Sequence, residues 1–291
     1  MPLVSVIIPS FNCAGYLPGA IESVLAQTMQ EFEIIVVDDG STDNTSSVME
    51  PYLADPRIRC IHQSNRGLPG ARNSGALAAG APYLAFLDAD DGLDAKALET
   101  MWGALSRSKA AWCVIDLLKV FRSGSQIQKT QVPEGDLFYG ILRDDFIRRG
   151  MFLRRDEFMA VGMYDAEMRN REDWDLNIRM LEAGKQFVYI PEPLYHYSWR
   201  EGSITTGNIP KVLFYTQMLL RKHHKRLADA GDRQAARIYA EQLWQMARNY
   251  GYRTRNLGKA LRCIAESLAY DLSIRRLVHP VIHHFGRIVT S

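Results

Sequence analysis

The sequence predicts an α/β fold, in which a mostly parallel sheet is flanked by helices and followed by a C-terminal helical appendage. Short apolar runs rich in β-branched residues alternate with helical patterns up to about residue 116, whereas the chain after Pro210 shows helical spacing. Such alternation favours parallel strands joined by crossover helices. We expect one domain over residues 1–205 and a helical region over residues 206–291.

Five strands and two helices are expected, in order, in the first part of the chain. The expected strands are VSVIIP (4–9), FEIIVV (32–37), RIRCI (57–61), PYLAFL (82–87) and WCVID (112–116). The expected helices are LPGAIESVLAQ (17–27), with apolar residues at helical spacing, and the segment STDNTSSVMEPYL (41–53), which opens on N-capping residues. A chain of 291 residues that is 47% hydrophobic can bury a substantial core.

The remainder of the chain gives weaker indications. Residues 116–150 contain turn-like breaks without a clear period, so their structure stays open. Two later sets of apolar residues repeat at i, i+4, i+7 and i+11, namely Tyr239, Leu243, Met246 and Tyr250, and then Leu257, Leu261, Ile264 and Leu268. We expect a helical hairpin that turns at Gly251 and the TRN segment after it.

Composition excludes several classes of protein. A formal net charge of +2 gives no global electrostatic reason to expect a nucleic-acid partner. The four cysteines are scattered, without the paired spacing of zinc sites or disulfide frameworks, so we expect reduced thiols and a cytoplasmic location. No stretch reaches the roughly 18 apolar residues of a spanning helix, which predicts a soluble or peripheral protein.

Polar residues follow four of the expected strands where each strand ends. Ligands of such sheets bind beyond the carboxyl ends of the strands, so we expect these residues to form one site. The densest group is in FLDADDGL, where Asp88, Asp90 and Asp91 occur within four positions. Gathered carboxylates suit Mg²⁺ or Mn²⁺, which relieve their repulsion. The alternative is an acidic turn that caps the following helix.

Two other segments provide groups for a nucleotide. VVDDGSTDNT places Asp38 and Asp39 at a strand end, where a carboxylate can accept hydrogen bonds from a base or ribose, although the segment could equally be a turn. NRGLPGARNSG sets glycines around Arg72 where a helix begins, an arrangement that can bring N–H groups and a guanidinium to a diphosphate. The alternative for Arg72 is a surface ion pair.

Candidate catalytic carboxylates occur in NREDWDLNIRM, in which Glu172 and Asp173 lie near the start of a helical pattern. A carboxylate there could deprotonate an acceptor hydroxyl, or it could simply be an acid at the positive end of a helix. The segment PLYHYSWREGSIT contains His196 and Arg200 beside a small-residue turn, and it could form a lid over phosphates.

Together, VSVIIPSFN, IESVLAQT, IIVVDDGSTDNT, GLPGARNSG, YLAFLDADD and EDWDLNIRM resemble family 2 glycosyltransferases of the GT-A fold. The resemblance covers about residues 3–205. It implies transfer of a sugar from a nucleoside diphosphate sugar, with inversion at the anomeric carbon and with Mn²⁺ or Mg²⁺. It assigns base and ribose binding to Pro9, Phe11, Asn12, Asp38 and Asp39.

The same resemblance assigns the remaining roles. The DxD motif is Asp88-Ala89-Asp90, with Asp88 towards the ribose and Asp90 as metal ligand. Arg72 belongs to the nucleotide pocket, and Asp173, beside Glu172, is the catalytic base. Many relatives carry a histidine near the position of Arg200. Arg200 itself is therefore expected to bind the diphosphate, and His196 is expected to be a substitute metal ligand. In its tyrosine-rich strand, His196 could also simply be packed.

The resemblance also bears on the substrates. UDP is the nucleotide that the resemblance implies, and Asp38 or Asp39 could accept from the uracil N–H, although other bases also offer donors. There is no motif or membrane helix of the kind that processive synthases have, so single-sugar transfer is expected. Basic, partly apolar segments at 221–228 and 273–289 could be solvated faces or could contact the inner face of a membrane. Such contact fits a glycan or lipid-linked acceptor in cell-envelope polysaccharide or lipopolysaccharide assembly.

Two other functions fit parts of the sequence. The pattern of a strand followed by DxDG also begins haloacid dehalogenase-like phosphatases, but there it follows the first strand and here the fourth. A catalytically inactive protein that binds nucleotide sugars is the second alternative, and the presence of Asp90 and Asp173 argues against it.

Overall fold

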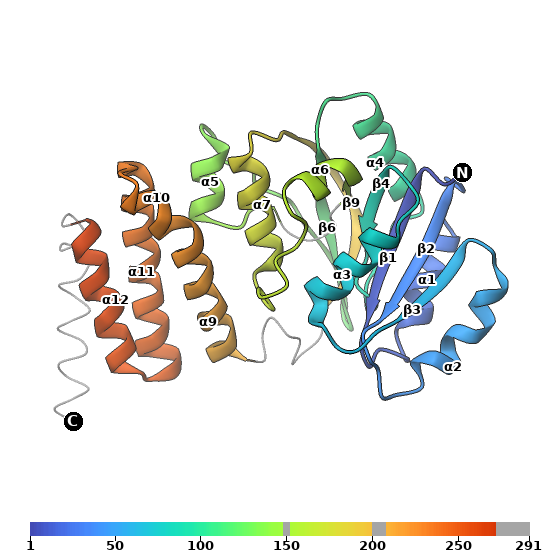
Figure 1. Ribbon diagram of the computed structural model, residues 1–291, viewed down its shortest axis with the longest axis horizontal. Helices are drawn as coiled ribbons and strands as arrows, with labels where there is room; N and C mark the ends of the chain where they lie inside the picture. Colours follow the sequence, from blue (N-terminus) through green and yellow to red (C-terminus); the bar gives the residue numbers. More distant parts are fainter. Residues whose placement is uncertain (148–151, 200–207, 272–291) are drawn as a thin grey trace. The chain divides into compact units, whose positions relative to one another are not determined.

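A computed structural model of the chain describes residues 1–147, 152–199 and 208–271. The chain divides into two compact units (Figure 1). The first holds residues 1–132 and the described residues from 146 to 199, and the second holds residues 133–145 and the described residues from 208 onward. The boundary expected between residues 205 and 206 lies outside the described residues. The C-terminal helices share their unit with residues 133–145, which lie within the expected domain of residues 1–205.

A single sheet runs through the first unit. Its order, within the described residues, is β3-β2-β1-β4-β8-β6-β9-β5, with β7 beside β6. The strands are β1 (Val4–Ser10), β2 (Phe32–Asp38), β3 (Ile58–His62), β4 (Tyr83–Phe86), β5 (Gly92–Leu93), β6 (Trp112–Phe121), β7 (Gly124–Gln128), β8 (Phe152–Arg154) and β9 (Phe187–Ser198). The five expected strands are β1, β2, β3, β4 and β6.

The sheet has a parallel part and a mixed part. Strands β3, β2, β1 and β4 are parallel neighbours, with Ser10 opposite Asp38 at the end of the β1–β2 ladder. Strand β8 then pairs antiparallel with both β4 and β6, whereas β6 and β9 are parallel. The parallel part therefore brings the carboxyl ends of β1, β2 and β4 to one edge, and the α/β prediction is confirmed.

Helices cover both faces of the parallel part. Alternate β1 residues Val4, Val6 and Ile8 share a buried apolar cluster with residues of α1 (Leu17–Leu25) and α4 (Ala97–Ser106). On the other face α3 (Gly67–Ala78) lies so close to β1 that a Cβ on Gly75 would be 2.4 Å from Cγ2 of Ile7. This approach fixes α3 against the sheet, which matters because α3 carries Arg72.

The other helices of the first unit are short or lie near the second half of the sheet. Residues 41–53, expected to be helical, contain α2 (Thr45–Met49) and most of the 3₁₀ helix η1 (Glu50–Ala54). Where the structure describes the unit, the remaining helices are α6 (Arg155–Ala160) and α7 (Glu172–Glu182).

The second unit is helical. It contains α5 (Leu137–Arg143), α9 (Ile209–Leu220), the π-helical segment η2 (Arg221–Lys225), α10 (Arg226–Asp229), α11 (Arg233–Thr254) and α12 (Leu257–Tyr270). The expected hairpin is α11 and α12, but α11 continues through Gly251. The chain turns within the expected TRN segment, at Arg255, which has a left-handed φ of 52°. No helix in the described part of the chain has the length and apolarity needed to cross a membrane.

Candidate active site

Polar residues meet beyond the carboxyl ends of β1, β2 and β4, as the sequence predicts. Asp39, just after β2, accepts hydrogen bonds from the backbone N–H groups of Arg66 and Gly67, both at 2.8 Å. It also accepts from Nε2 of Gln63 at 2.6 Å. A carboxylate at a helix N-terminus satisfies donors that have no partner within the helix. Asp39 therefore anchors the start of α3 to the sheet.

Asp38 and Asn12 organise the adjoining loops. Oδ1 of Asp38 accepts from the Ser41 N–H at 2.9 Å, and Oδ2 lies 3.1 Å from Nδ1 of His62. Asn12 has a left-handed φ of 53°, and its Oδ1 accepts from the Thr42 N–H at 2.8 Å. The loops after β1 and β2 are thus joined to each other by hydrogen bonds.

Pro9 and Phe11 differ in exposure. Pro9 is buried inside β1, where it lies opposite Val37 of β2. Phe11 follows the strand end, and 47% of its surface is exposed. An exposed aromatic ring at this edge offers a flat surface for a planar ligand, whereas Pro9 shapes the strand beneath it.

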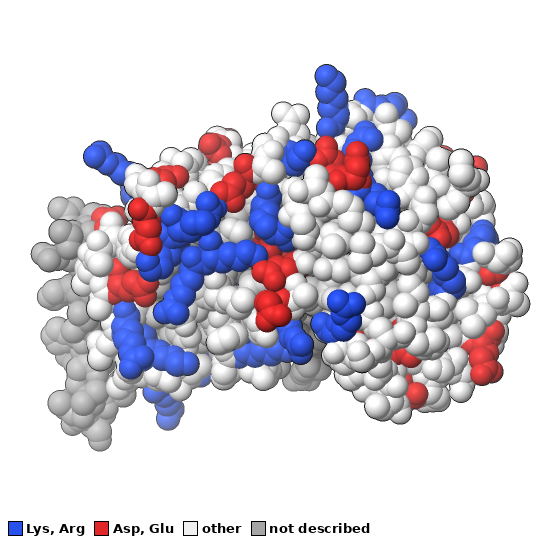
Figure 2. All heavy atoms as spheres, viewed as in Figure 1, with Lys and Arg blue, Asp and Glu red and all other residues white. Residues whose placement is uncertain are grey.

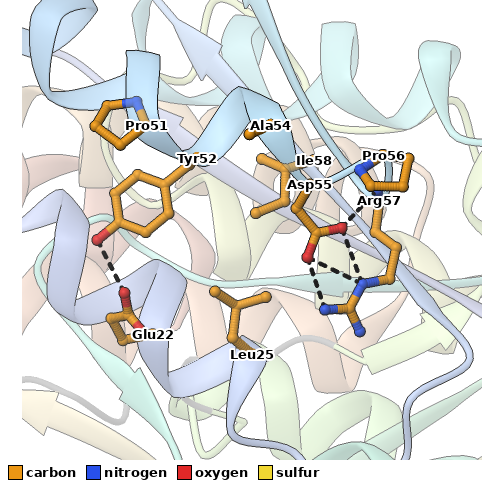
Figure 3. Close-up of a pocket in the computed structure, with 9 residues that line it drawn as sticks. All are labelled: Glu22, Leu25, Pro51, Tyr52, Ala54, Asp55, Pro56, Arg57 and Ile58. Atoms are coloured by element: carbon orange, nitrogen blue, oxygen red, sulfur yellow. Dashed lines mark hydrogen bonds and ion pairs between the residues drawn. The ribbon is translucent and has the colours of Figure 1, made fainter.

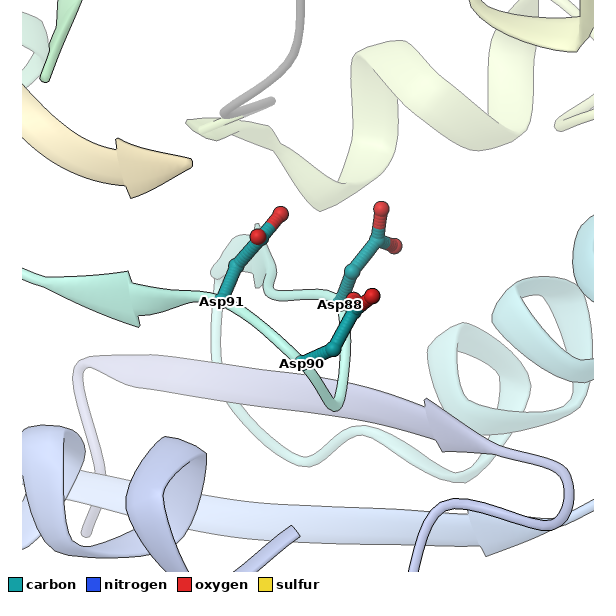
Figure 4. A group of neighbouring side chains, drawn as sticks. All are labelled: Asp88, Asp90 and Asp91. Carbon is teal, nitrogen blue, oxygen red and sulfur yellow. The ribbon is translucent and has the colours of Figure 1, made fainter. Parts of the chain in front are cut away.

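The turn after β4 gathers three carboxylates, shown in Figure 4. Asp88, Asp90 and Asp91 each offer one oxygen atom within 4.8 Å of the others. These hard oxygen donors fit Mg²⁺ or Mn²⁺. Ala89, between them, is buried at 3% exposure and packs in the core, so its side chain fixes the turn.

Asp91 has a structural role that the sequence did not reveal. The Tyr195 hydroxyl donates to its Oδ2 at 2.7 Å, and the Ser198 N–H donates to its Oδ1 at 2.8 Å. The Tyr195 oxygen in turn accepts from the Asp88 N–H at 3.2 Å. Asp91 thereby attaches the carboxylate turn to β9.

His196 does not belong to the group of possible metal ligands that Asp88, Asp90 and Asp91 form. It lies in β9, opposite Gly92 of β5 and Leu118 of β6. Its role as a metal ligand stays a prediction, and Arg200 lies outside the described residues.

Arg72 is the centre of the charged network. Its Nη2 is 2.7 Å from Oδ1 of Asp88, and its Nη1 is 3.2 Å from both Oε1 of Glu172 and Oδ1 of Asp173. Burial alone would lower the pKa of Arg72, but the charges of Asp88 and Asp173 outweigh it and raise that pKa well above its usual value. Arg72 is 5% exposed, so it is no surface ion pair.

The two candidate catalytic carboxylates begin α7. The helix starts after Arg171, which has a left-handed φ of 68°. Burial, reinforced by the charge of Asp173 and opposed by Arg72, raises the pKa of Glu172 to about 7. The Asp173 side chain is more open, at 22% exposure, and its Oδ1 also accepts from the Tyr164 hydroxyl at 3.1 Å. Tyr164 was not predicted, because nothing in its local sequence points to Asp173.

A separate hollow is lined by residues of α1, η1 and the start of β3 (Figure 3). Its walls include Leu25, Tyr52 and Ile58, and the Tyr52 hydroxyl donates to Glu22 at 3.1 Å. Ile58 opens β3, so the hollow lies at the amino end of that strand, away from the carboxyl edge that holds the carboxylates. It contains none of the predicted site residues.

Comparison with known proteins decides the family. The model of Glycosyl transferase family 2 matches residues 5–166, more than half of the chain. The chain belongs to glycosyl transferase family 2. This assignment rests on the segment that contains β1, Arg72 and the carboxylate turn, and it confirms the resemblance drawn from the motifs.

Individual relatives of this family 2 glycosyltransferase are consistent with the family assignment. The uncharacterized glycosyltransferase EpsJ of Bacillus subtilis is 27% identical over 246 residues, which are 78% of this chain and 70% of EpsJ. The chondroitin synthase of Escherichia coli is 36% identical over 202 residues, 67% of this chain. The chain spans only 29% of that synthase, and 19% of the chondroitin synthase of Pasteurella multocida.

Solved structures share the fold. S. aureus TarS, residues 1–349, in complex with UDP-GlcNAc has a TM-score of 0.69 at 18% identity, covering 93% of this chain and 81% of that one. The crystal structure of the same TarS fragment has a TM-score of 0.67 at 19% identity, covering 96% and 86%. The family 2 chain therefore has the GT-A fold.

Proposed function

We propose that this family 2 glycosyltransferase moves one sugar from a UDP-sugar to a glycan or lipid-linked acceptor, with inversion at the anomeric carbon and with Mn²⁺ or Mg²⁺ bound. The observation that carries the proposal is the guanidinium of Arg72, which joins Asp88 of the donor side to Asp173. The UDP-GlcNAc complex of a structural neighbour and the chondroitin synthases among the relatives support the donor class and a polysaccharide acceptor.

The residues on the donor side bind different parts of the nucleotide sugar. Phe11 stacks on the base, Asp38 and Asp39 lie at the base and ribose, and Asp88 takes the ribose. Asp90 would hold the metal, with His196 as a candidate second ligand, and the metal would supply charge stabilisation for the departing diphosphate. Arg72 contributes a second positive charge at the same place.

Asp173 accepts the proton of the acceptor hydroxyl. The acceptor oxygen then forms its bond to the anomeric carbon while the bond from that carbon to the diphosphate breaks, and the diphosphate leaves with the electron pair. A single displacement of this kind inverts the configuration and needs no covalent nucleophile. Glu172 and Asp173 share Nη1 of Arg72, so Arg72 binds the proposed base less strongly than it would bind Asp173 alone.

The direct test measures binding and turnover of a panel of nucleotide sugars, with and without Mn²⁺. Asp90→Ala should lose metal-dependent donor binding. Asp173→Asn should bind the donor but turn over at least about 100-fold more slowly, as expected for loss of a general base. Asp156→Asn, on the exposed start of α6, is the matched control. A wild-type protein that binds no donor under any condition contradicts the proposal.

We also propose that the helical unit makes a peripheral contact with the inner, cytoplasmic face of a membrane. Lys and Arg side chains gather over its helices on the face drawn in Figure 2. Arg221 and Arg226 are exposed, and Phe214 on α9 is 59% exposed, a combination that suits an anionic interface. His223 and His224, from the same basic segment, are buried instead. Truncation near residue 270 should weaken binding to anionic vesicles, and unchanged binding would refute the contact through the last segment.

A further inference from the structure

Tyr164 is a buried side chain that ends at the proposed base. It is 2% exposed, and its ring centroid lies 5.4 Å from those of both Phe86 and Phe158. The guanidinium of Arg72 lies over the ring at 5.1 Å. The ring is therefore held on several sides, so the position of its hydroxyl is set by packing.

The backbone of Tyr164 is fixed by Asn73, the residue next to Arg72 on α3. Nδ2 of Asn73 donates to the Tyr164 carbonyl at 2.8 Å, and the Tyr164 N–H donates to Oδ1 of Asn73 at 3.0 Å. Such a reciprocal pair leaves little freedom to the residue that it holds. Helix α3 thus positions both Arg72 and Tyr164.

The preceding turn is attached to α7, which carries Asp173. Gly162 and Met163 both have left-handed backbones, with φ of 85° and 61°. The carbonyl groups of Val161 and Met163 accept hydrogen bonds from Arg179 at 2.5 and 2.6 Å. Because Arg179 belongs to α7, the helix that presents the base also holds the turn that presents Tyr164.

The hydroxyl of Tyr164 and Nη1 of Arg72 bind the same oxygen of Asp173. The distances to Oδ1 are 3.1 Å and 3.2 Å. Burial first, and then the charge of Asp173, raise the pKa of Tyr164 well above its usual value, so the hydroxyl keeps its proton and acts as donor. Within the described residues, Oδ2 of Asp173 accepts no hydrogen bond.

We infer that Tyr164 is a positioning residue for the proposed base: held by Asn73, it fixes Oδ1 of Asp173 and leaves Oδ2 for the acceptor hydroxyl. This inference rests on the proposed function. Loss of the Tyr164 hydroxyl allows the carboxylate to rotate and lowers the share of molecules in which Oδ2 is in place. Donor binding does not depend on that rotation.

The experiment uses Tyr164→Phe, which keeps the ring packing and removes only the hydroxyl. We expect kcat to fall about 10-fold or more, the effect of losing one hydrogen bond to a charged group, while KM for the donor stays within about two-fold. Tyr83→Phe is the matched control, since Tyr83 is also buried and its hydroxyl accepts from Arg154 at 3.2 Å. Its kcat should equal that of the wild type.

Two further variants separate positioning from a general loss of structure. In the Asp173→Asn background, Tyr164→Phe should change the remaining rate less than about two-fold, because the two residues act as a unit. Asn73→Ala should lower kcat in the same direction, and its effect should not add fully to that of Tyr164→Phe. Thermal unfolding of each variant shows whether the fold is kept.

The outcomes are distinguishable. The positioning role is overturned if the wild type is active and Tyr164→Phe leaves kcat unchanged. It is also overturned if Tyr164→Phe lowers kcat by the same factor in the wild type and in the Asp173→Asn background. Both results leave the proposed function intact. A wild type that transfers sugar from no donor overturns the proposed function, and the positioning role with it.

Discussion

Nη1 of Arg72 lies 3.2 Å from Oδ1 of Asp173, so the cation proposed for the diphosphate directly contacts the carboxylate proposed as the base. The same side chain contacts Asp88 through Nη2 at 2.7 Å. A planar guanidinium can serve three carboxylates at once, whereas an ammonium group cannot reproduce that fork.

Arg72→Lys should therefore lose both functions together. We expect UDP binding to weaken at least about ten-fold and turnover to fall further, because the carboxylates lose their shared partner. Isothermal titration with UDP and a transfer assay measure the two effects. Arg59→Lys, which alters an exposed pair with Glu33, is the control and should change neither. Normal binding in Arg72→Lys would contradict the role given to the guanidinium.

The raised pKa of Glu172 predicts a dependence of stability on pH. Burial raises this pKa from 4.5 to about 7, so the folded protein binds a proton more tightly than the unfolded chain does. The free energy of unfolding should then decrease as the pH rises through that window, by up to roughly 3 kcal/mol. Urea unfolding between about pH 5 and pH 8 measures it.

Glu172→Gln tests the assignment of that slope. The neutral side chain should remove the Glu172 contribution and flatten the decrease. Glu182→Gln, exposed at the other end of α7, should keep the wild-type slope. An identical slope in wild type and Glu172→Gln would assign the pH dependence to another group.

Asp90 and Asp91 are adjacent but should respond differently to substitution. In Asp91→Asn the amide oxygen cannot satisfy both the Tyr195 hydroxyl and the Ser198 N–H as the carboxylate does, and we expect a loss of about 1–3 kcal/mol of stability. Asp90→Asn should keep stability and lose Mn²⁺ binding. Chemical denaturation and Mn²⁺ titration separate the two, and the reverse pattern would exchange their roles.

Gly75→Ala should destabilise the first unit. The added methyl group would meet Ile7 at 2.4 Å in a fully packed region, and we expect a loss of about 1–3 kcal/mol. Gly19→Ala on α1 is the control, since among the described residues no atom outside its own helix turn lies within 4 Å of the added Cβ. There the better helix propensity of alanine should leave stability equal or raise it by up to about 1 kcal/mol. Thermal unfolding of both variants measures the difference.

The sequence predicted those parts of the site that depend on strand ends. Asp38 and Asp88 follow apolar runs, and the parallel order of β2, β1 and β4 brings those strand ends to one edge of the sheet. Arg72 lies inside α3, so its position depends on how that helix packs on the sheet. The assignment of Asp173 as the base comes from the family resemblance and stays a prediction, since an acid at a helix start is ambiguous by itself.

Other features depend on contacts between residues distant in the chain. Tyr164 and Asn73 are joined by two hydrogen bonds across 91 positions, and neither belongs to a pattern with a recognisable period. The strand β7 and helix α5 lie in the stretch that had no clear periodicity, and α5 belongs with helices far along the chain. Tertiary packing decides such elements, and local propensity does not.

Asp39 shows a different limit. Its ligand contact stays a prediction, and the structure adds a role in which its oxygens accept from Gln63, Arg66 and Gly67. A carboxylate that caps a helix and one that receives a nucleoside have the same sequence pattern, because both need only an acceptor at a strand end.

The adjacency of Arg72 and Asn73 has a consequence for how this enzyme can be altered. The two side chains come from neighbouring positions of one helix. A small tilt of α3 would therefore move the Arg72 guanidinium, which is proposed to bind the diphosphate, and change the alignment of Asp173, the proposed base, at the same time. Variants that gain a new donor by moving α3 would then sacrifice rate, and a change of donor preference that preserves rate is better sought at the loops after β1 and β2, which hold neither Asp173 nor Tyr164.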